Sequence, residues 1–388
     1  MSNASLLARE RNHLMQTYRR QPVAFVAGEG CWLVDADGDR YLDCLSGLAV
    51  VSVGHSNPRV AAAVATQMNR LSHVSNLFVT EPMLDLAHQL SALAGLERVF
   101  FTNCGATANE TAIKLARRYG QDRRGPGCYE VVSLLDSFHG RTLATLAATG
   151  QLEKHTRFQP LPAGFGQVPG GDLAALWAAV GEQTAAVLIE TIQGEGGVVP
   201  LAPDYLVGVR EICDRSGALL IVDDVQAGLG RTGSWFSWQG LGFEPDIATV
   251  AKALGNGLPI GACLAKEEVA AAFVPGDHAT TFGGGPAVCA AGLAVLAEIE
   301  QRDLLVNCRA RSQQLIAGLT PLVKEVRGRG LLLAAVLEEE RAGEVAAKAL
   351  ANGLVVNAVR PDAVRFAPPL TISEAEIAEA LVRFEKAL

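Results

Sequence analysis

The sequence predicts an α/β protein with a large domain around a mostly parallel central sheet and a smaller α+β domain. Between residues 98 and 250, short runs that are apolar on both faces alternate with segments of helical periodicity. This alternation is typical of parallel strands that helices cover on both sides. The chain has 388 residues, which is long enough for two domains. Its 49% hydrophobic content excludes a disordered chain, and its 40 glycines, which follow no Gly-X-Y period, exclude a collagen-like one.

The expected elements follow one another in a regular order. The N-terminal region up to residue 50 alternates short β-like runs with turns, and a helix is expected over residues 58–71. Strands are expected at residues 98–102, 131–135, 185–189, 218–222 and 247–250, and helices at 108–119, 286–301 and 305–324. The C-terminal region is expected to form strands at 330–336 and 364–366 and helices at 342–352 and from Ser373 onwards. The composition changes near residue 285, so we place a domain boundary there.

Charge and cysteine usage limit the classes of partner. The chain carries 33 basic and 41 acidic residues, a net charge of −8, whereas a dedicated nucleic-acid binder needs a basic face. Its 8 cysteines form no C-x-x-C pair, which argues against structural zinc and a disulfide scaffold and favours free thiols in a reducing compartment. Neither a signal-peptide pattern nor a membrane span is recognisable. We therefore expect a cytoplasmic protein with no metal, nucleic-acid or membrane partner.

Residues that follow the predicted strands are the candidate site residues, because ligands of open α/β sheets bind beyond the carboxyl ends of the strands. Residues 103–109, NCGATAN, lead from the first of these strands directly into a helix. A glycine-bearing turn at a helix N-terminus offers free amides and a positive dipole end, which suits a phosphate. An ordinary helix start, capped by Asn103 or Thr107, is the structural alternative.

The strand predicted at 218–222 ends in two carboxylates, Asp223 and Asp224. Such a pair suits a magnesium site, a helix cap, or a contact with the basic nitrogen of a cofactor. The magnesium-nucleotide interpretation requires a G-x-x-x-x-G-K-[ST] loop, which the chain lacks. The other two interpretations stay open on these residues alone.

Residues 228–233, GLGRTG, match the dinucleotide-binding pattern G-x-G-x-x-G. That pattern has physical meaning only where its last glycine begins an amphipathic helix. Here the segment SWFSWQG follows, which is aromatic and lacks helical periodicity. We interpret residues 228–233 as a loop and keep an NAD-dependent oxidoreductase as the alternative class of enzyme.

Lys252 follows the strand predicted at 247–250, and its neighbours are alanines and glycines. Burial favours the neutral amine of a lysine, which Schiff-base chemistry requires. An exposed lysine at a strand end is the structural alternative, and Lys252 on its own favours that alternative.

Taken together, these segments resemble the class III (fold type I) pyridoxal-phosphate (PLP) aminotransferases, and within them the acetylornithine aminotransferase group. The matching motifs, in order along almost the whole chain, are GHSNP at 54–58, FFTNCGATANE at 100–110, SFHGRT at 137–142, QGEGG at 193–197, DDVQ at 223–226, AKALG at 251–255, TFGG at 281–284, RGRG at 327–330 and RFAPP at 365–369. The resemblance implies a PLP-binding large domain of residues 51–285. It also implies a smaller domain built from both termini, residues 1–50 and 286–388.

The resemblance implies a set of cofactor contacts for PLP. Lys252 would form the covalent bond to the cofactor and then move the substrate proton, while Asp223 would pair with the pyridine nitrogen. The other expected contacts are Gly105, Ala106 and Thr281 at the phosphate, Phe138 and Val225 on the two faces of the ring, and Gln226 at the phenolic oxygen. In this family the threonine at the position of Thr281 is supplied by the other subunit of a homodimer, and Thr280 would lie beside the substrate there.

The resemblance also implies the reaction, which is a step of arginine biosynthesis. N2-acetyl-L-ornithine and 2-oxoglutarate would be converted to N-acetyl-L-glutamate 5-semialdehyde and L-glutamate in two alternating half-reactions. Arg141 would bind the substrate α-carboxylate, since a planar guanidinium matches a carboxylate bidentately. Glu195 would mask Arg365 while the amino donor is bound, and Arg365 would be freed for the second carboxylate of 2-oxoglutarate or glutamate.

A few positions depart from the family pattern or bear on specificity. Cys104 stands where serine or threonine is common, Thr107 where glutamate is usual, and Asp224 where glutamate follows the cofactor aspartate. Leu48 stands where members that take free ornithine carry a tyrosine, which favours an N-acylated substrate. Other ω-aminotransferases, with N-succinylornithine, ornithine, 4-aminobutyrate or a lysine-pathway substrate, stay alternatives. His139 is expected to be structural.

Overall fold

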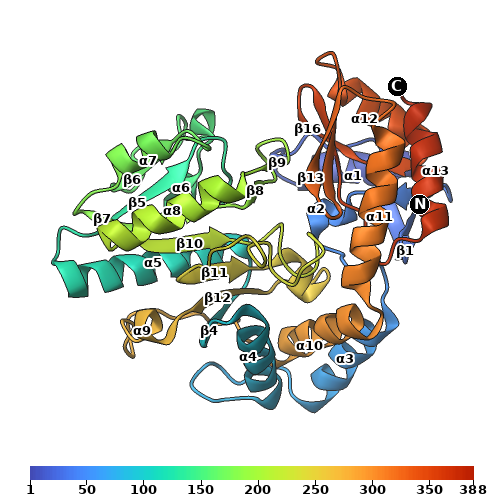
Figure 1. Ribbon diagram of the computed structural model, residues 1–388. Helices are drawn as coiled ribbons and strands as arrows, with labels where there is room; N and C mark the ends of the chain where they lie inside the picture. Colours follow the sequence, from blue (N-terminus) through green and yellow to red (C-terminus); the bar gives the residue numbers. More distant parts are fainter.

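The computed structural model describes residues 1–388, and a seven-stranded sheet lies at the centre of its larger part (Figure 1). The strand order is β4, β12, β11, β10, β7, β5, β6, and β12 alone runs antiparallel to the others. The strands are β4 (Arg98–Thr102), β5 (Glu130–Leu134), β6 (Phe165–Val168), β7 (Thr184–Ile189), β10 (Leu219–Asp223), β11 (Ile247–Val250) and β12 (Gly261–Ala265). The predicted α/β class with a mostly parallel sheet is therefore confirmed.

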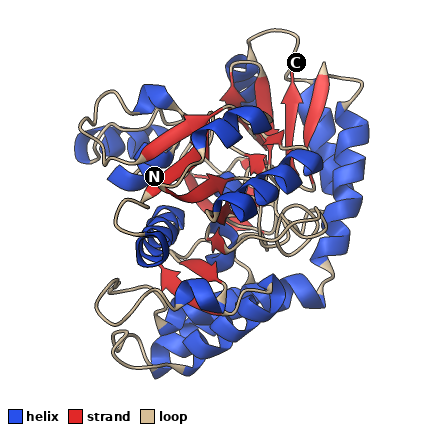
Figure 2. Cartoon of the chain, turned by 60° about the vertical axis from the view of Figure 1, so that its left-hand side comes forward, coloured by secondary structure: helices blue, strands red, loops and turns tan.

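Helices cover both faces of this sheet, as the doubly apolar strands require. Along β10, Ile221 packs in one core cluster with residues of α5 (Gly105–Arg124), whereas Leu220 and Val222 pack in another with residues of α8 (Pro203–Ser216). Helices α4 (Glu81–Ala94) and α7 (Leu173–Ala179) contribute to the second cluster. Figure 2 shows the strands between the layers of helices. The strand ends are thereby held in fixed positions.

The two ends of the chain form the smaller part of the molecule together, and both termini lie there (Figure 1). One sheet joins β1 (Phe25–Glu29), β2 (Trp32–Asp35) and β3 (Arg40–Asp43) to β15 (Leu354–Val355), and α1 (Asn3–His13) and α2 (Ser46–Ala49) flank it in sequence. A second sheet has the order β13 (Glu325–Arg329), β14 (Leu332–Val336), β17 (Ala363–Phe366), β16 (Asn357–Arg360). Its helices are α11 (Leu304–Leu319), α12 (Ala342–Ala351) and α13 (Glu374–Glu385).

Helix α10 (Pro286–Gln301) lies where the predicted domains meet. It packs against α3 (Pro58–Arg70) and α4, as Figure 1 shows at the bottom of the view. Its Val295 belongs to the core cluster of the smaller part, whereas Leu296 belongs to a cluster of the large sheet. The domain boundary near residue 285 and the ranges derived from it stay predictions.

Two differences from the predicted elements have clear causes. The helix predicted over 305–324 ends at Leu319. Thr320 still has helical backbone, but Pro321 has no amide hydrogen with which to continue the helical hydrogen bonds, and β13 then begins at Glu325. Strand β12 was not predicted, since its sequence GACLA begins with glycine and has neither alternation nor β-branched residues. The remaining short elements are α6 (Leu143–Ala148), η1 (Leu152–Lys154), β8 (Ile192–Gln193), β9 (Val199–Pro200), η2 (Lys252–Gly255) and α9 (Glu267–Ala270).

All eight cysteines are free thiols, and only Cys104 is exposed. No helix combines the length and the apolar composition needed to cross a bilayer.

Candidate active site

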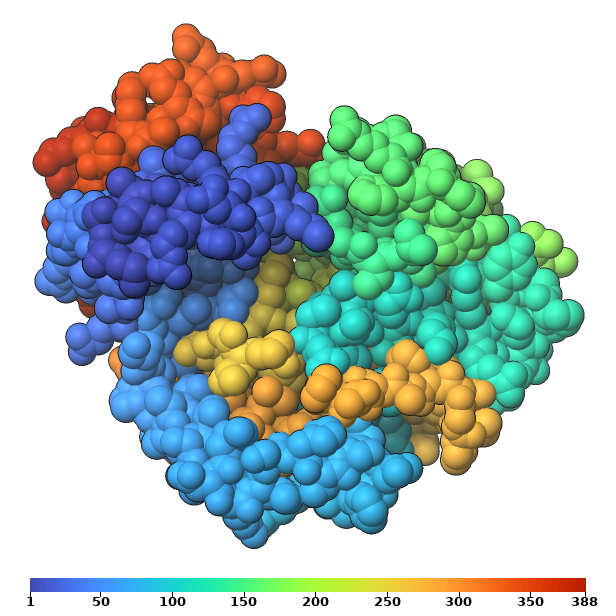
Figure 3. Space-filling model, turned by 180° about the vertical axis from the view of Figure 1, so that it is seen from behind, coloured from blue at the N-terminus to red at the C-terminus, as the bar shows by residue number.

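Loops that follow five parallel strands surround a cavity of about 430 Å³. Its lining includes Asn103, Cys104, Gly105 and Ala106 after β4, Phe138, His139, Gly140 and Arg141 after β5, Glu190 and Glu195 after β7, Asp223, Val225 and Gln226 at the end of β10, and Ala251 and Lys252 after β11. Figure 3 shows the molecule hollowed on this face, between the blue N-terminal residues, the teal and green residues from about 105 onwards and the gold residues near 255. All predicted site residues except Arg365, Thr280 and Thr281 line this one cavity.

Helix α5 begins at the cavity wall with Gly105, a position that has no room for a side chain. A Cβ atom at Gly105 would lie 2.6 Å from Val225 Cγ1, so the missing side chain allows Val225 to approach the helix start. The first-turn amides of Gly105 and Ala106 have no acceptor inside the helix. The Thr107 hydroxyl accepts a hydrogen bond from the Cys104 amide at 3.1 Å and is used in the helix cap. The amides of Gly105 and Ala106 are thus left for an anion.

The Asp223 carboxylate is 5% exposed, and three donors fix its position. Its Oδ2 accepts from Asn109 Nδ2 at 2.7 Å and from His139 Nδ1 at 2.8 Å, and its Oδ1 accepts from the Val225 amide at 3.1 Å. Thr249 Oγ1 donates to Asn109 Oδ1 at 2.7 Å and thereby fixes the amide orientation. Sequence analysis missed Asn109; the available signal was an asparagine among the mostly small and apolar residues of the buried face of α5. The structural role of His139 is to orient Asp223.

Glu190 is the second cavity residue that sequence analysis missed. Its Oε2 accepts from the Phe138 amide at 3.0 Å and its Oε1 from the Gly194 amide at 3.4 Å. Burial raises the pKa of Glu190, and the nearby charge of Asp223 raises it further. The residue joins the loop that carries Phe138 to the loop that carries Glu195. The sequence signal for Glu190 was the same as for Asp223: a carboxylate at the end of a fully buried strand.

Lys252 lies at the cavity floor in an unusual backbone conformation. It begins the turn η2 with a φ of +40°, in the left-handed region, which costs about 1 kcal/mol for a residue other than glycine. Burial lowers the pKa of the Lys252 amine, the charge of Arg365 lowers it further, and the carboxylates of Glu195, Asp223 and Glu190 oppose the shift. The amine is therefore more readily neutral than that of an ordinary lysine, as nucleophilic attack on a carbonyl requires.

The loop after β5 supplies an aromatic ring and a guanidinium to the same cavity. The Arg141 guanidinium carbon lies 5.5 Å from the centroid of the Phe138 ring, within the range of a cation–π contact. Arg141 is exposed at the cavity. Its side chain can therefore bind an anionic ligand without first breaking an ion pair.

Glu195 and Arg365 form an ion pair, with 2.5 Å between Glu195 Oε1 and Arg365 Nη1. Gln226 joins them: its Nε2 donates to Glu195 Oε1 at 3.2 Å, and its Oε1 accepts from Arg365 Nη1 at 3.2 Å. Burial by itself would raise the pKa of Glu195, but the charges of Arg365 and Lys252 outweigh it, and the pKa is lowered. Glu195 is thus ionised at neutral pH. A Cβ at Gly194 would lie 1.8 Å from Gln226 Oε1, so this arrangement depends on that glycine.

Apart from Arg365, three residues named by sequence analysis do not line the cavity of their own chain. Thr281 lines a separate narrow hollow together with His73. Thr280 Oγ1 donates to Asn103 Oδ1 at 3.2 Å. Leu48 is 41% exposed and belongs to a turn in which its φ is +71°. The cross-subunit role of the two threonines stays a prediction.

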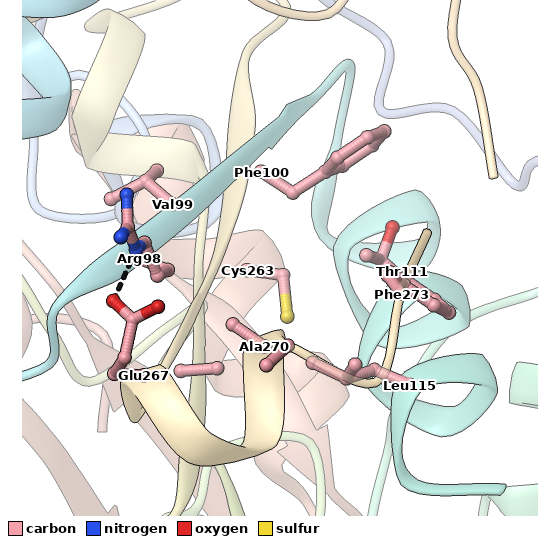
Figure 4. A pocket seen from close by; sticks show the side chains of 11 residues that line it. Arg98, Val99, Phe100, Thr111, Leu115, Cys263, Glu267, Ala270 and Phe273 are labelled. Atoms are coloured by element: carbon pink, nitrogen blue, oxygen red, sulfur yellow. Dashed lines mark hydrogen bonds and ion pairs between the residues drawn. The ribbon is translucent and has the colours of Figure 1, made fainter. Parts of the chain in front are cut away.

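A second cavity, of about 250 Å³, lies away from the strand ends, between β4, β12, α5 and α9 (Figure 4). Its walls are mostly apolar, and Arg98 forms an ion pair with Glu267 at its edge. Its Cys263 is 3% exposed, and burial raises the pKa of that thiol to about 12. The thiol is therefore protonated at neutral pH, and we assign the chemistry to the first cavity.

Residues 228–233 form a loop, as predicted, and no helix follows them before β11. Arg231 is 1% exposed and donates to the Leu331 carbonyl at 3.1 Å, to the Pro368 carbonyl at 2.5 Å and to Ser52 Oγ at 3.1 Å. The arginine thus fastens the strand-end loop to segments from both ends of the chain. The NAD alternative is wrong, because no helix N-terminus follows the last glycine to hold a pyrophosphate.

The donor set of the first cavity fits PLP. A fixed carboxylate can hold a protonated ring nitrogen, the α5 amides can hold a phosphate, and a lysine of lowered pKa can attack an aldehyde. A parallel sheet that brings these three groups to one edge defines a PLP-dependent enzyme of fold type I.

Comparisons with known proteins specify the family. Residues 15–388 match the family model described as aminotransferase class III. The chain is 49% identical to an acetylornithine aminotransferase of Gloeobacter violaceus (96% of this chain, 95% of the relative) and 45% identical to one of Caldanaerobacter subterraneus subsp. tengcongensis (97% of each). Among solved structures, an ornithine aminotransferase of Toxoplasma gondii ME49 is similar with a TM-score of 0.96 and 32% identity, covering 100% of this chain and 95% of that one. The chain belongs to the class III aminotransferases, and it is a transaminase with PLP as its cofactor.

Proposed function

We propose that this aminotransferase converts N2-acetyl-L-ornithine and 2-oxoglutarate to N-acetyl-L-glutamate 5-semialdehyde and L-glutamate, a step of arginine biosynthesis. The observation that carries the proposal is that the cavity is lined by one arginine, Arg141, and by a glutamate, Glu195, that is paired with a second arginine behind it. Arg141 is exposed to ligand, whereas Arg365 is paired with Glu195. Such a site can take a substrate with one carboxylate and, after the pair opens, a substrate with two. The names of the relatives support the same substrate.

The cofactor is proposed to be held by residues of four strand ends. Asp223 pairs with the ring nitrogen, the amides of Gly105 and Ala106 hold the phosphate, Lys252 provides the covalent attachment, and Phe138 and Val225 pack on the two ring faces. Gln226 is proposed to hydrogen-bond the phenolic oxygen, which requires that it leave its contacts with Glu195 and Arg365. When bound, PLP supplies an electron sink for the carbanion that forms at the substrate.

Lys252 is proposed as the acid–base group of both half-reactions. Its Nζ takes the proton from the substrate carbon that carries the amino group and later returns a proton. The lowered pKa of Lys252 suits this task, because a base must be neutral at the working pH. Asn109 and His139 contribute indirectly, because they hold the Asp223 carboxylate in one orientation.

Carboxylate recognition is proposed to alternate between the half-reactions. The α-carboxylate of acetylornithine binds Arg141, and Glu195 keeps Arg365 neutralised. When 2-oxoglutarate or glutamate enters, Glu195 moves away and Arg365 binds the second carboxylate bidentately. The resemblance favours an N-acylated amino donor, because Leu48 stands where members that take free ornithine, whose second amine is charged, carry a tyrosine. Succinylornithine, 4-aminobutyrate and a lysine-pathway substrate stay as alternatives.

The enzyme is proposed to act as a homodimer in the cytoplasm, with Thr281 and Thr280 completing the site of the other subunit. Both threonines lie outside the cavity of their own chain, which is the observation that favours such sharing. Free, mostly buried thiols support a reducing compartment.

A panel of amino donors tests the substrate proposal. The PLP-loaded enzyme is mixed with acetylornithine, succinylornithine, ornithine, 4-aminobutyrate or glutamate, and the change in cofactor absorbance is followed in single half-reactions. We expect acetylornithine and glutamate to give the highest ratios of rate to saturation constant. A preference for ornithine or 4-aminobutyrate of more than about tenfold, equivalent to ~1.4 kcal/mol, would overturn the substrate assignment.

A further inference from the structure

The guanidinium of Arg365 is held from two sides. On one side, Nη1 donates to Glu195 Oε1 at 2.5 Å, to Gln226 Oε1 at 3.2 Å and to the Gly194 carbonyl at 3.4 Å. On the other side, Nε donates to Asn357 Oδ1 at 3.1 Å. The third nitrogen, Nη2, is buried and has no partner in the chain. A buried guanidinium nitrogen without a partner can donate a hydrogen bond to one more acceptor, such as a carboxylate oxygen.

Asn357 is placed for this contact by the sheet register. Strands β16 and β17 are antiparallel, and Asn357 lies directly opposite Arg365. Directly opposed side chains of an antiparallel pair lie within reach of each other. Because Nε–H can only donate, the amide oxygen of Asn357 must be the atom that faces it. Neither end of this contact belongs to the loop that carries Glu195, so the contact does not depend on the position of Glu195.

The charge of the acceptor matters as much as its position. An amide oxygen accepts the hydrogen bond without neutralising the guanidinium, whereas a carboxylate there would form a second permanent ion pair. Arg365 would then be compensated in both half-reactions, and an incoming carboxylate would have to compete with it. The neutral asparagine orients Arg365 without neutralising it, so the charge of Arg365 is compensated by Glu195 or by a substrate carboxylate.

We propose that Asn357 is a positioning residue for the second-carboxylate subsite: it keeps Arg365 directed at the position of the Glu195 carboxylate during the half-reaction in which Glu195 has moved away. The inference rests on the proposed exchange of Glu195 for a substrate carboxylate. Of the contacts that hold Arg365, the one from Asn357 in β16 stays in place, and the one from Glu195 in the loop after β7 can be released. Sequence analysis gave Asn357 no role.

Three variants test the proposal through the ratio of the two half-reactions. Asn357→Ala removes the acceptor, and Asn357→Asp replaces it by a charged one. Ala358→Asp adds the same charge at the exposed neighbouring position and serves as the matched control. For both Asn357 variants we expect the KM for 2-oxoglutarate and the saturation constant for glutamate to rise about tenfold or more. The saturation constant for acetylornithine should change less than about twofold, and kcat at saturating substrate should be retained.

The outcomes separate this inference from the proposed function. A folded Asn357 variant that leaves the glutamate-to-acetylornithine ratio unchanged overturns the role of Asn357, provided that Arg365→Ala shifts the same ratio in the same assay. If Arg365→Ala does not shift it, the proposed function of the ion pair fails instead, and the inference fails with it. Loss of both half-reactions to the same extent in Asn357→Ala would indicate a purely structural residue and overturn the inference. Should Asn357→Asp fail to fold, Asn357→Ala decides the question alone.

Discussion

Arg365 and Glu195 are joined by a 2.5 Å contact, yet the two partners are buried to very different degrees. The guanidinium side chain is 1% exposed, whereas the carboxylate side chain is 30% exposed. The arginine is also anchored in a strand, and the glutamate belongs to a loop. Glu195 is therefore the partner that can leave, and the buried charge of Arg365 then requires another anion.

Glu195→Gln should shift preference toward the dicarboxylic substrate. Without the carboxylate, Arg365 has no ionic partner, so glutamate and 2-oxoglutarate no longer have to displace one. We expect their saturation constants to fall by a few-fold to about tenfold and that of acetylornithine to rise. Half-reaction titrations measure both constants. Parallel changes in the two constants would contradict the account.

Lys252→Ala should abolish turnover while the fold is kept. Removing a general base typically lowers rates by about 10²- to 10⁴-fold, and here the covalent attachment is lost as well. Absorbance of the PLP-treated protein should show no borohydride-fixable band, and circular dichroism should match the wild type. Turnover within about tenfold of the wild type would contradict the assignment.

Gly105→Ala should weaken cofactor binding. The added methyl group would lie 2.6 Å from Val225 Cγ1, so Val225 must shift away from the start of α5. We expect the PLP dissociation constant to rise about tenfold in fluorescence titrations. Gly127→Ala is the matched control, because its nearest atom lies 4.0 Å away. Equal affinity in both variants would sink the proposed contact between Val225 and the ring.

Asp224→Asn should change the pH dependence of stability. Burial raises the pKa of Asp224 to about 7, above the ordinary value of 3.8. The contribution to stability is thus complete below about pH 4 and is lost as the pH rises through 7, because ionisation is unfavourable only in the folded state. The loss is at most about 4 kcal/mol. In thermal melts, the variant should gain in Tm relative to the wild type between pH 5 and 8. A difference that is constant over this range would refute the raised pKa.

Arg231→Met should destabilise the protein, although Arg231 is not among the residues that line the cavity. Three acceptors, the Leu331 and Pro368 carbonyls and Ser52 Oγ, would lose their donor. We expect the free energy of unfolding to fall by about 3 kcal/mol, seen as a lower urea midpoint. Arg118→Met, which removes the partly exposed ion pairs of Arg118 with Asp122 and Asp277, should change the free energy of unfolding by less than about 0.5 kcal/mol. Similar midpoints for both variants would contradict the role of Arg231.

The strand-end part of the site could be located from the sequence, because a buried strand that ends in Asp223, a glycine turn that opens α5 and a lysine after β11 are local features. Each feature alone left a structural alternative open, and their roles were expected only from the resemblance to the family. Their convergence then follows from parallel strands, whose carboxyl ends meet at one edge.

The supporting contacts were not predictable from sequence, because they join segments that are distant in the chain. Asn109 and Asp223 are 114 residues apart, and Asn357 meets Arg365 only through the β16–β17 register. Likewise, nothing local shows that the arginine of the GLGRTG loop turns inward to Leu331 and Pro368. Tertiary hydrogen bonds of this kind leave no periodic pattern.

The most direct test of the account compares two half-reactions of Arg365→Ala. Because Arg365 is proposed to bind only the second carboxylate, we predict that the rate-to-saturation ratio for glutamate falls by at least about a hundredfold, equivalent to ~2.7 kcal/mol, while that for acetylornithine falls by less than about fivefold. Equal losses in the two half-reactions would contradict the claim that one cavity alternates between a masked and a freed arginine.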